Sequence, residues 1–158
     1  MKTAVIYYSF SGNSTMVAET IKGALGAEVF EIKTVDNKKR SNFAMLFLGG
    51  GQVLFNKKPA ILPLSVDISA YDLIILGTPV WAWSPAPALL TFLSEKKING
   101  KKIALFCCHG GGKGKVFEKL KALLPGNSFV GEIDFEEPAS KMDGAALKQK
   151  ISEWVKNF

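Results

Sequence analysis

The chain has 158 residues, of which 47% are hydrophobic, so it is long and apolar enough for one domain over residues 1–158 with its own core. Ordinary glycine and proline contents exclude the fibrous and disordered classes. Lys and Arg outnumber Asp and Glu by 20 to 14, which favours anionic partners (phosphorylated cofactors, acidic proteins, nucleic acid or lipid head groups) or reflects only a lysine-rich surface.

Short apolar runs predict strands that are buried on both faces, as a parallel sheet requires. These runs are residues 3–8, 28–32, 73–76, 103–107 and 129–133. Apolar stripes with helical spacing lie between and after them. Their members are Val17, Ile21 and Leu25, then Leu89, Leu90 and Leu93, then Phe117, Leu120 and Leu124, and finally Leu147, Ile151, Trp154, Val155 and Phe158.

This alternation of strands and helices predicts an α/β fold, with helices on both faces of a parallel sheet. Right-handed crossovers leave few topologies, and five strands fit the order 2-1-3-4-5. Ser84 and Pro85 are expected to be the N-cap and first residue of the helix after the third strand.

The region between the second and third strands, residues 36–67, has no regular pattern. Its uncharged centre, residues 41–56, is rich in large apolar side chains, and basic residues flank it. One interpretation is a broken helix packed over the sheet and interrupted at glycines 49–51. The other is a partner-docking or membrane-surface segment over residues 41–58, because apolar stretches with basic flanks favour interfaces.

A run of hydroxyl and amide side chains lies between the first strand and the first helix. The first turn of a helix presents unpaired N–H groups and the positive end of the helix dipole, so anions bind there. A helix cap needs only one such side chain, and this turn has five. Glycine within it allows the backbone to approach a ligand closely. The sequence therefore predicts a phosphate site formed by Ser9, Ser11, Gly12, Asn13, Ser14 and Thr15.

Two nucleotide-binding motifs fit the sequence less well. The glycine-rich run 110–115 departs from the P-loop pattern at His109, where glycine is required, and at Val116, where a hydroxyl residue is required. A dinucleotide fingerprint that begins at Gly112 fails at Phe117, and it follows the fourth predicted strand instead of the first.

Residues 5–21, with the sequence VIYYSFSGNSTMVAETI, resemble the flavodoxin signature. That family has two aliphatic residues, an aromatic, a hydroxyl residue, a small residue three positions later, a threonine, and then an alanine and an aliphatic residue on the helix. Ser14 replaces the usual threonine and keeps its donor. The order of elements extends the resemblance over nearly the whole chain, without the insertion that splits the last strand of long-chain flavodoxins. The resemblance implies a flavodoxin-like three-layer α/β/α sandwich and FMN as the phosphate-bearing cofactor.

The loop after the third strand carries two tryptophans. Loops at the carboxyl ends of strands bind ligands in open α/β sheets, and an indole stacks well on a planar ring. The resemblance implies that Thr78, Pro79, Val80, Trp81 and Trp83 flank the isoalloxazine, with Trp81 slightly favoured over Trp83 as the stacking residue. The alternative is that both tryptophans only cap the core.

The loop after the fourth strand is rich in glycine and, unlike that of many electron-transfer flavodoxins, has no tyrosine or tryptophan. In the resembled family this loop binds the ring edge through its backbone, which implies contacts from Cys108, His109, Gly110 and Gly111. Cys107, Cys108 and His109 are consecutive, so their side chains alternate in direction. They are therefore not expected to converge on a metal ion or to form a nucleophile pair.

Several features favour a cytoplasmic protein without a transmembrane segment. The two cysteines are adjacent and form no disulfide framework, which fits a reducing cytosol. The apolar run after Lys2 is too short for a signal peptide and lacks a cleavage site. Residues 73–93 are uncharged and long enough to span a bilayer, but a glycine and three prolines divide them into a strand, a loop and a helix.

The predicted function is that of an FMN-binding redox protein in which the flavin supplies the chemistry and no side chain acts as a catalytic acid or base. We expect a low-potential electron carrier for redox partner proteins, acidic ones included, rather than a nucleic-acid-binding protein. Electron-transfer flavodoxins are acidic, so the charge of +6 leaves two alternatives open. One is an NAD(P)H-dependent quinone or small-molecule reductase, and the other is an interaction protein without flavin.

Overall fold

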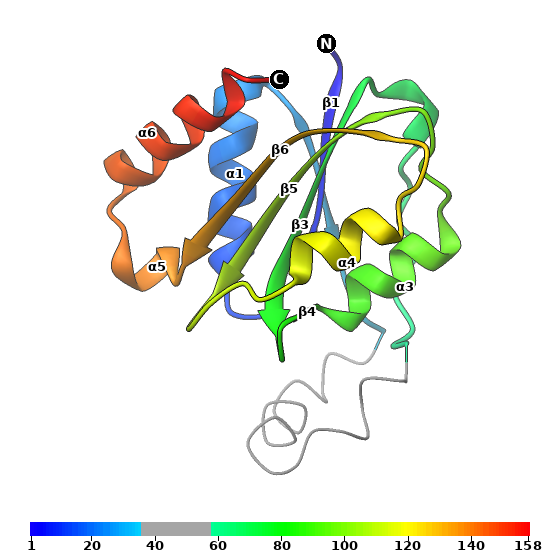
Figure 1. The fold of residues 1–158 in the computed structure, drawn as a ribbon, viewed down its shortest axis with the longest axis horizontal. Helices are drawn as coiled ribbons and strands as arrows, with labels where there is room; N and C mark the ends of the chain where they lie inside the picture. Colours follow the sequence, from blue (N-terminus) through cyan, green and yellow to red (C-terminus); the bar gives the residue numbers. More distant parts are fainter. Residues whose placement is uncertain (36–57) are drawn as a thin grey trace.

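The computed structural model describes residues 1–35 and 58–158 and has a parallel sheet at its centre (Figure 1). The strand order is β2-β1-β3-β5-β6, which confirms the predicted order 2-1-3-4-5 of the five parallel strands. A two-residue strand, β4, pairs with β3 in the antiparallel direction. The strands are β1 (Thr3–Tyr8), β2 (Glu28–Ile32), β3 (Leu73–Trp81), β4 (Ser84–Pro85), β5 (Lys102–His109) and β6 (Ser128–Glu136).

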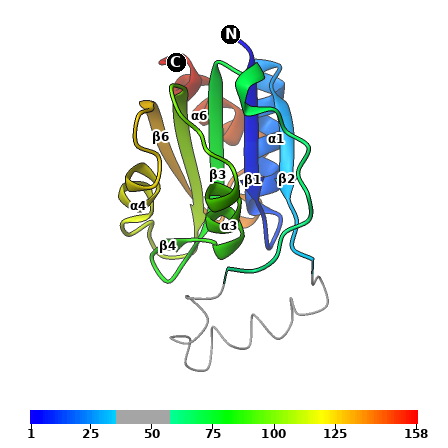
Figure 2. The same cartoon turned by 90° about the vertical axis from the view of Figure 1, so that its right-hand side faces the viewer.

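Helices cover both faces of the sheet, as the alternation of elements predicted (Figure 2). One layer contains α1 (Asn13–Leu25) and α6 (Gly144–Val155), and the other contains α3 (Pro87–Glu95) and α4 (Val116–Ala122). The structure is therefore the expected three-layer α/β/α sandwich. Among the residues that the structure describes, two shorter elements complete it, the 3-10 turn η2 (Ile68–Ala70) and the helix α5 (Pro138–Lys141).

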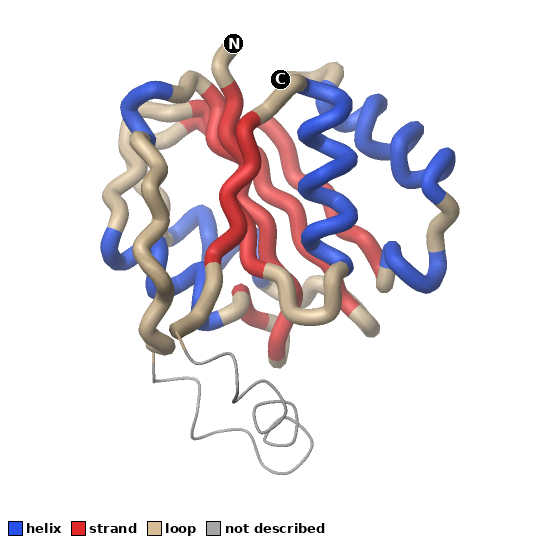
Figure 3. The backbone as a smooth tube through the Cα atoms, turned by 180° about the vertical axis from the view of Figure 1, so that it is seen from behind, coloured by secondary structure: helices blue, strands red, loops and turns tan. Residues whose placement is uncertain are grey.

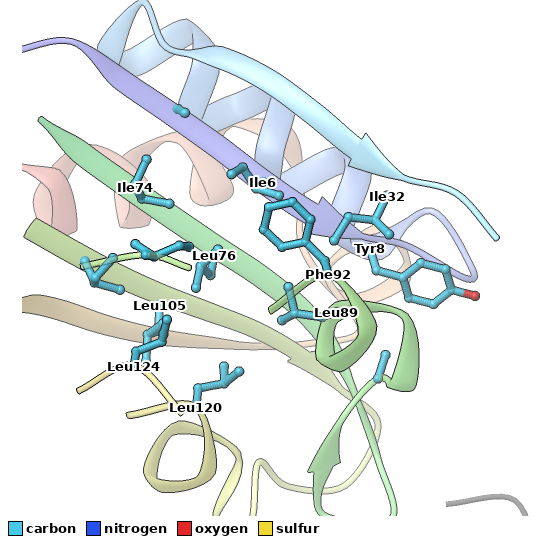
Figure 4. Close-up of a cluster of buried hydrophobic side chains, with 14 of the residues drawn as sticks. Ile6, Tyr8, Ile32, Ile74, Leu76, Leu89, Phe92, Leu105, Leu120 and Leu124 are labelled. Carbon is cyan, nitrogen blue, oxygen red and sulfur yellow. The ribbon is translucent and has the colours of Figure 1, made fainter. Parts of the chain in front are cut away.

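Alternate residues of the strands supply the two halves of the core. On one face Ile6, Leu76 and Leu105 belong to a cluster with Phe92 of α3 and Leu120 of α4 (Figure 4). Because both faces are buried, the strands read as continuous apolar runs in the sequence. The opposite face buries Val5, Ile75, Phe106, Val17, Ile21, Leu147 and Ile151.

The carboxyl ends of the parallel strands lie at one edge of the sheet, at the bottom of Figure 1. Both chain termini lie at the opposite end, as the view from behind in Figure 3 also shows. The turn after β1, the loop after β3 and the loop after β5 therefore meet at the same edge. This is the edge at which open α/β sheets bind ligands.

The chain between β3 and α3 differs from its prediction. β3 runs beyond its predicted end to Trp81, and Ser84 and Pro85 form β4 instead of opening the helix. The helix begins at Pro87 with Ala86 as its N-cap. The predicted helix start was wrong because both prolines suit a first helical position, and only pairing with β3 distinguishes them. β5 and β6 also run past their predicted ends.

The predicted irregular segment 36–67 is described only in part. Residues 36–57, which include almost all of the candidate docking segment 41–58, lie outside the described residues. The chain that follows returns beside the end of β2, where Thr34 and Ile61 form an isolated antiparallel bridge.

No helix within residues 1–35 and 58–158 is long and apolar enough to cross a membrane. The uncharged stretch 73–93 is divided among β3, β4 and α3. Its glycine and prolines therefore indicated the correct interpretation of that stretch.

Candidate functional site

The predicted phosphate turn connects β1 to α1 at the carboxyl edge of the sheet. Gly12 is the N-cap of α1, and its φ of 92° lies in the left-handed region that favours glycine. The hydroxyl oxygen of Ser9 accepts hydrogen bonds from the backbone N–H groups of Gly12 (3.2 Å) and Thr15 (3.3 Å). The turn thus closes around the hydroxyl oxygen of Ser9, which two backbone N–H groups contact. It lies at a helix N-terminus of the kind that attracts anions.

Ser14 has a buried hydroxyl group that needs an acceptor. The residue is 1% exposed, and its Oγ has no hydrogen-bond partner among the described residues. The Cys108 thiol lies beside it, but a thiol is a weak hydrogen-bonding group and the pair lacks hydrogen-bond geometry. A buried polar group without a partner costs about 1–3 kcal/mol, which a phosphate oxygen that accepts from Ser14 would recover. The turn therefore fits a phosphate group.

Asn13 connects the turn to the chain after β6. Its Nδ2 donates to the hydroxyl of Ser11 (3.0 Å), and its Oδ1 accepts from the backbone N–H of Ala139 in α5 (2.9 Å). Both ends of the amide contact the protein, so Asn13 braces the turn against α5. α5 was not predicted from the sequence, although Pro138 in its first turn is a signal for a helix start.

The loop after β3 is a tight hairpin. Ala82 and Trp83 join Trp81 to Ser84 with φ values of 45° and 58°. Two-residue hairpins of this kind favour Asn and Gly, because other residues cost roughly 1–2 kcal/mol each in the left-handed region. The hairpin therefore holds an exposed tryptophan in a strained backbone conformation.

Thr78, Pro79 and Val80 form the base of this hairpin. The hydroxyl of Thr78 is buried, where it accepts from the backbone N–H of Ala86 (2.9 Å) and donates to the carbonyl of Pro79 (2.9 Å). Thr78 thus fixes the position at which the chain returns along β3. Pro79 and Val80 are partly exposed at the carboxyl edge.

The two tryptophans have different environments. Trp81 is partly buried and meets Tyr8 and Phe10 edge to face, with ring centroids 5.8 and 5.5 Å away. Trp83 is 68% exposed and lies against Gly114, where an added Cβ would come within 2.7 Å of the Trp83 Cβ. Trp81 therefore joins the hairpin to the phosphate turn, whereas Trp83 joins it to the glycine-rich loop.

His109 holds the glycine-rich loop after β5. Its Nδ1 accepts from the backbone N–H of Gly112 (2.9 Å), and its Nε2 lies 3.0 Å from Oδ2 of Asp134 on β6. Lys113 donates to the other carboxylate oxygen (2.8 Å), and the carbonyl of His109 accepts from the N–H of Glu137 (2.9 Å). The imidazole thus points toward β6, whereas Gly110 and Gly111 are exposed to solvent.

Asp134 is the charged centre of this cluster and was not among the residues predicted from the sequence. Burial raises its pKa, but the hydrogen bonds from Lys113 and His109 outweigh burial and hold the pKa below its ordinary value. Asp134 is therefore ionised at neutral pH and pairs with the charge of Lys113. It lies 25 residues from His109 in the chain and reaches it only through the pairing of β5 with β6.

The two cysteines lie on opposite faces of the sheet, as the alternation of side chains predicts. Burial raises the pKa of both thiols, that of Cys108 to about 12, so both are neutral at physiological pH. Among the described residues, no group of three or more His, Cys, Asp and Glu side chains is arranged to hold a metal ion.

Comparisons with known proteins agree with this geometry. A family model described as Flavodoxin matches residues 2–158. Flavodoxin 1 of Escherichia coli strain K12 is 24% identical over 190 residues, which span 99% of this chain and 92% of the relative.

Two solved structures share the fold. A flavoprotein in complex with FMN from Lactobacillus acidophilus NCFM is 25% identical, with a TM-score of 0.68 and 98% of both chains covered. A flavodoxin, WrbA-like protein from Agrobacterium tumefaciens is 18% identical, with a TM-score of 0.62 and coverage of 99% of this chain and 94% of the other. The family match over nearly all of the sequence and the arrangement of the sheet lead to one conclusion: this chain belongs to the flavodoxin family.

Proposed function

We propose that this chain binds FMN at the carboxyl edge of its sheet and acts as a low-potential electron carrier between redox proteins. The observation that carries the proposal is the phosphate turn. There the Ser9 hydroxyl gathers two backbone donors, and the buried Ser14 hydroxyl has no acceptor among the described residues. The similar Lactobacillus acidophilus flavoprotein, which forms a complex with FMN, supports the choice of cofactor.

In this proposal the phosphate is bound by neutral groups. The hydroxyls of Ser9, Ser11, Ser14 and Thr15 would hold it, next to the positive end of the α1 dipole. Gly12, whose N–H already donates to Ser9, would let the backbone approach the phosphate closely. Asn13 would fix the turn through its bond to α5. This arrangement binds a phosphate without a lysine or arginine from the turn.

The ring would lie between the hairpin and the glycine-rich loop. Pro79, Val80, Trp81 and Trp83 would border it on one side, with Trp81 and Trp83 offering indole surface. The backbone of residues 108–111 would border it on the other side. When bound, FMN supplies the electron-transfer chemistry, and these residues position it and limit access to it.

A reductase is the second candidate function. The similarity to a flavodoxin, WrbA-like protein and the exposed indole of Trp83 favour it, because a planar small molecule can stack on that surface. In either case we propose that residues 1–158 act as one domain, which the family match over residues 2–158 supports.

One set of measurements tests these proposals. The purified protein is titrated with FMN while flavin fluorescence is followed, and the complex is then mixed anaerobically with NADH or NADPH. A carrier is expected to quench the flavin fluorescence and to be bleached slowly or not at all without a reductase. Rapid bleaching by the nucleotide alone would support the reductase instead. A colourless protein that leaves FMN fluorescence unchanged would overturn the flavin assignment.

A further inference from the structure

The imidazole of His109 is enclosed at the end of β5, between the glycine-rich loop and β6. Its side chain is 9% exposed, and both ring nitrogens have a partner. Nδ1 lies 2.9 Å from the backbone nitrogen of Gly112, and Nε2 lies 3.0 Å from Oδ2 of Asp134. The histidine therefore links the middle of the loop to the neighbouring strand.

The two contacts determine which ring nitrogen carries the proton. A backbone N–H can only donate, so Nδ1 must accept from Gly112 and carries no hydrogen. Nε2 then carries the hydrogen and donates it to the carboxylate of Asp134. The carboxylate thus selects the one neutral form of His109 that can hold Gly112.

Lys113 reinforces the same connection from within the loop. Its Nζ donates to Oδ1 of Asp134 (2.8 Å) and lies 5.6 Å from the centroid of the Phe117 ring at the start of α4. One carboxylate oxygen of Asp134 therefore binds His109 and the other binds Lys113, on the two sides of Gly110, Gly111 and Gly112. Gly112 itself has a φ of 125°, a conformation open to glycine, so the loop needs an external partner to remain in one arrangement.

The loop also transmits this constraint to the hairpin. Gly114 packs against Trp83 so closely that an added Cβ would lie 2.7 Å from the Trp83 Cβ. A shift of the loop at Gly112 would therefore change the support of the exposed indole. The side chain of His109 is largely enclosed, but its contacts determine the position of two surface segments.

We infer that His109 is a positioning residue for the flavin: through Gly112 and Asp134 it fixes the loop that borders the ring, and so sets FMN affinity and redox potential. This inference rests on the proposed FMN site and assigns His109 a role through the loop, with Asp134 as its partner. A merely structural histidine would contribute to folding and leave the flavin potential unchanged.

Three variants separate these possibilities. His109→Leu removes both contacts, whereas His109→Asn keeps an acceptor at the same number of bonds from the backbone as Nδ1. Glu132→Gln is the matched control. Glu132 lies on β6 with Asp134, and this change removes its exposed ion pair with Lys121 of α4 (2.7 Å) without touching His109. For each protein, FMN affinity and the two-electron midpoint potential are measured, and circular dichroism checks the fold.

We expect His109→Leu to weaken FMN binding by about fivefold to tenfold, as the loss of the hydrogen bond that holds Gly112 implies. The affinities for oxidised and reduced FMN should fall by unequal factors. If these two factors differ threefold, the two-electron potential shifts by ~14 mV. His109→Asn should recover most of the affinity, and Glu132→Gln should match the wild type. The nitrogen-15 spectrum of the flavin-free protein should show the Nε2-protonated imidazole.

Specific results would overturn the inference. Wild-type affinity and potential in His109→Leu would remove the positioning role while leaving the proposed function intact. The same conclusion follows if His109→Asn is as defective as a folded His109→Leu protein, or if the imidazole is protonated at Nδ1. A wild-type protein that binds no FMN would instead overturn the proposed function, and the inference with it.

Discussion

The phosphate turn and the glycine-rich loop lie at the same edge of the sheet but are held by different kinds of contact. In the turn, residues 9–15, Ser9 binds the N–H groups of Gly12 and Thr15 within one short segment. In the loop, residues 109–114, the contacts reach another strand and the hairpin after β3. The structure of a short-range motif can be predicted from the sequence, whereas the contacts of a loop held by distant residues cannot.

The two regions also differ in their electrostatics. The turn has polar but uncharged side chains, and its donors act with the α1 dipole. The loop is held in place by the ionised carboxylate of Asp134, which contacts Lys113 and His109. Negative charge should therefore be most damaging in the turn, whereas changes of backbone shape or pairing should matter most near the loop.

The largest expected effect comes from placing negative charge in the turn. Gly12→Asp with Ser14→Asp should weaken FMN binding by at least about 100-fold, because charges about 4 Å apart repel by several kcal/mol near a protein surface. Fluorescence titration with FMN measures the loss. Gly23→Asp with Ser152→Asp adds the same charges at exposed positions outside the predicted site and should leave the affinity within about twofold. If the first variant keeps wild-type affinity, the phosphate assignment is wrong.

The contact between the loop and the hairpin is tested by Gly114→Ala. The glycine has a φ of 53°, and its added methyl group would overlap Trp83, so the free energy of unfolding should fall by about 1–3 kcal/mol. Urea denaturation at an unchanged m-value measures this loss. In a Trp83→Gly background the loss should shrink by about 1 kcal/mol or more. Equal losses in both backgrounds would show that the indole is not the reason for the glycine.

A smaller effect of opposite sign is expected at the hairpin tip. Ala82→Gly should raise the free energy of unfolding by about 0.5–1 kcal/mol, because glycine relieves the positive φ at a modest entropic cost. Ala145→Gly provides the contrast, since that exposed alanine is the second residue of the ordinary helix α6 and the change should lower stability. Denaturant unfolding of both proteins would contradict the strain argument if the two variants lose stability alike.

The smallest effect concerns the charge of Asp134. Its pKa is lowered in the folded protein, so its stabilising contribution is complete above the ordinary carboxyl pKa of 3.8 and disappears as pH falls through the lowered value. Asp134→Asn should therefore reduce the free energy of unfolding by up to about 1 kcal/mol at about pH 7, and by less below about pH 4. Unfolding curves at several pH values test this, and a gap that grows toward acid would refute the sign.

Sequence reasoning succeeded where neighbouring residues decide the structure. The strands, the helical stripes and the residues of the turn follow from periodicity and from side-chain chemistry within short windows. It failed at α3, where Pro85 and Pro87 are locally equivalent and only the antiparallel pairing of β4 excludes the first as the start of the helix. It also missed α5, whose contact with Asn13 joins residues 126 positions apart.

The sequence by itself determined the parallel α/β sandwich, the turn after β1 and the family to which the chain belongs. Only the tertiary structure decided that Trp81 lies on a strand and Trp83 in the turn of a strained hairpin, with different neighbours. The same holds for His109, whose imidazole turns toward Asp134 because β5 and β6 pair in one register. The physical reason is the range of the interactions: hydrophobic periodicity and helix N-termini act within a few residues, whereas sheet register brings distant side chains together.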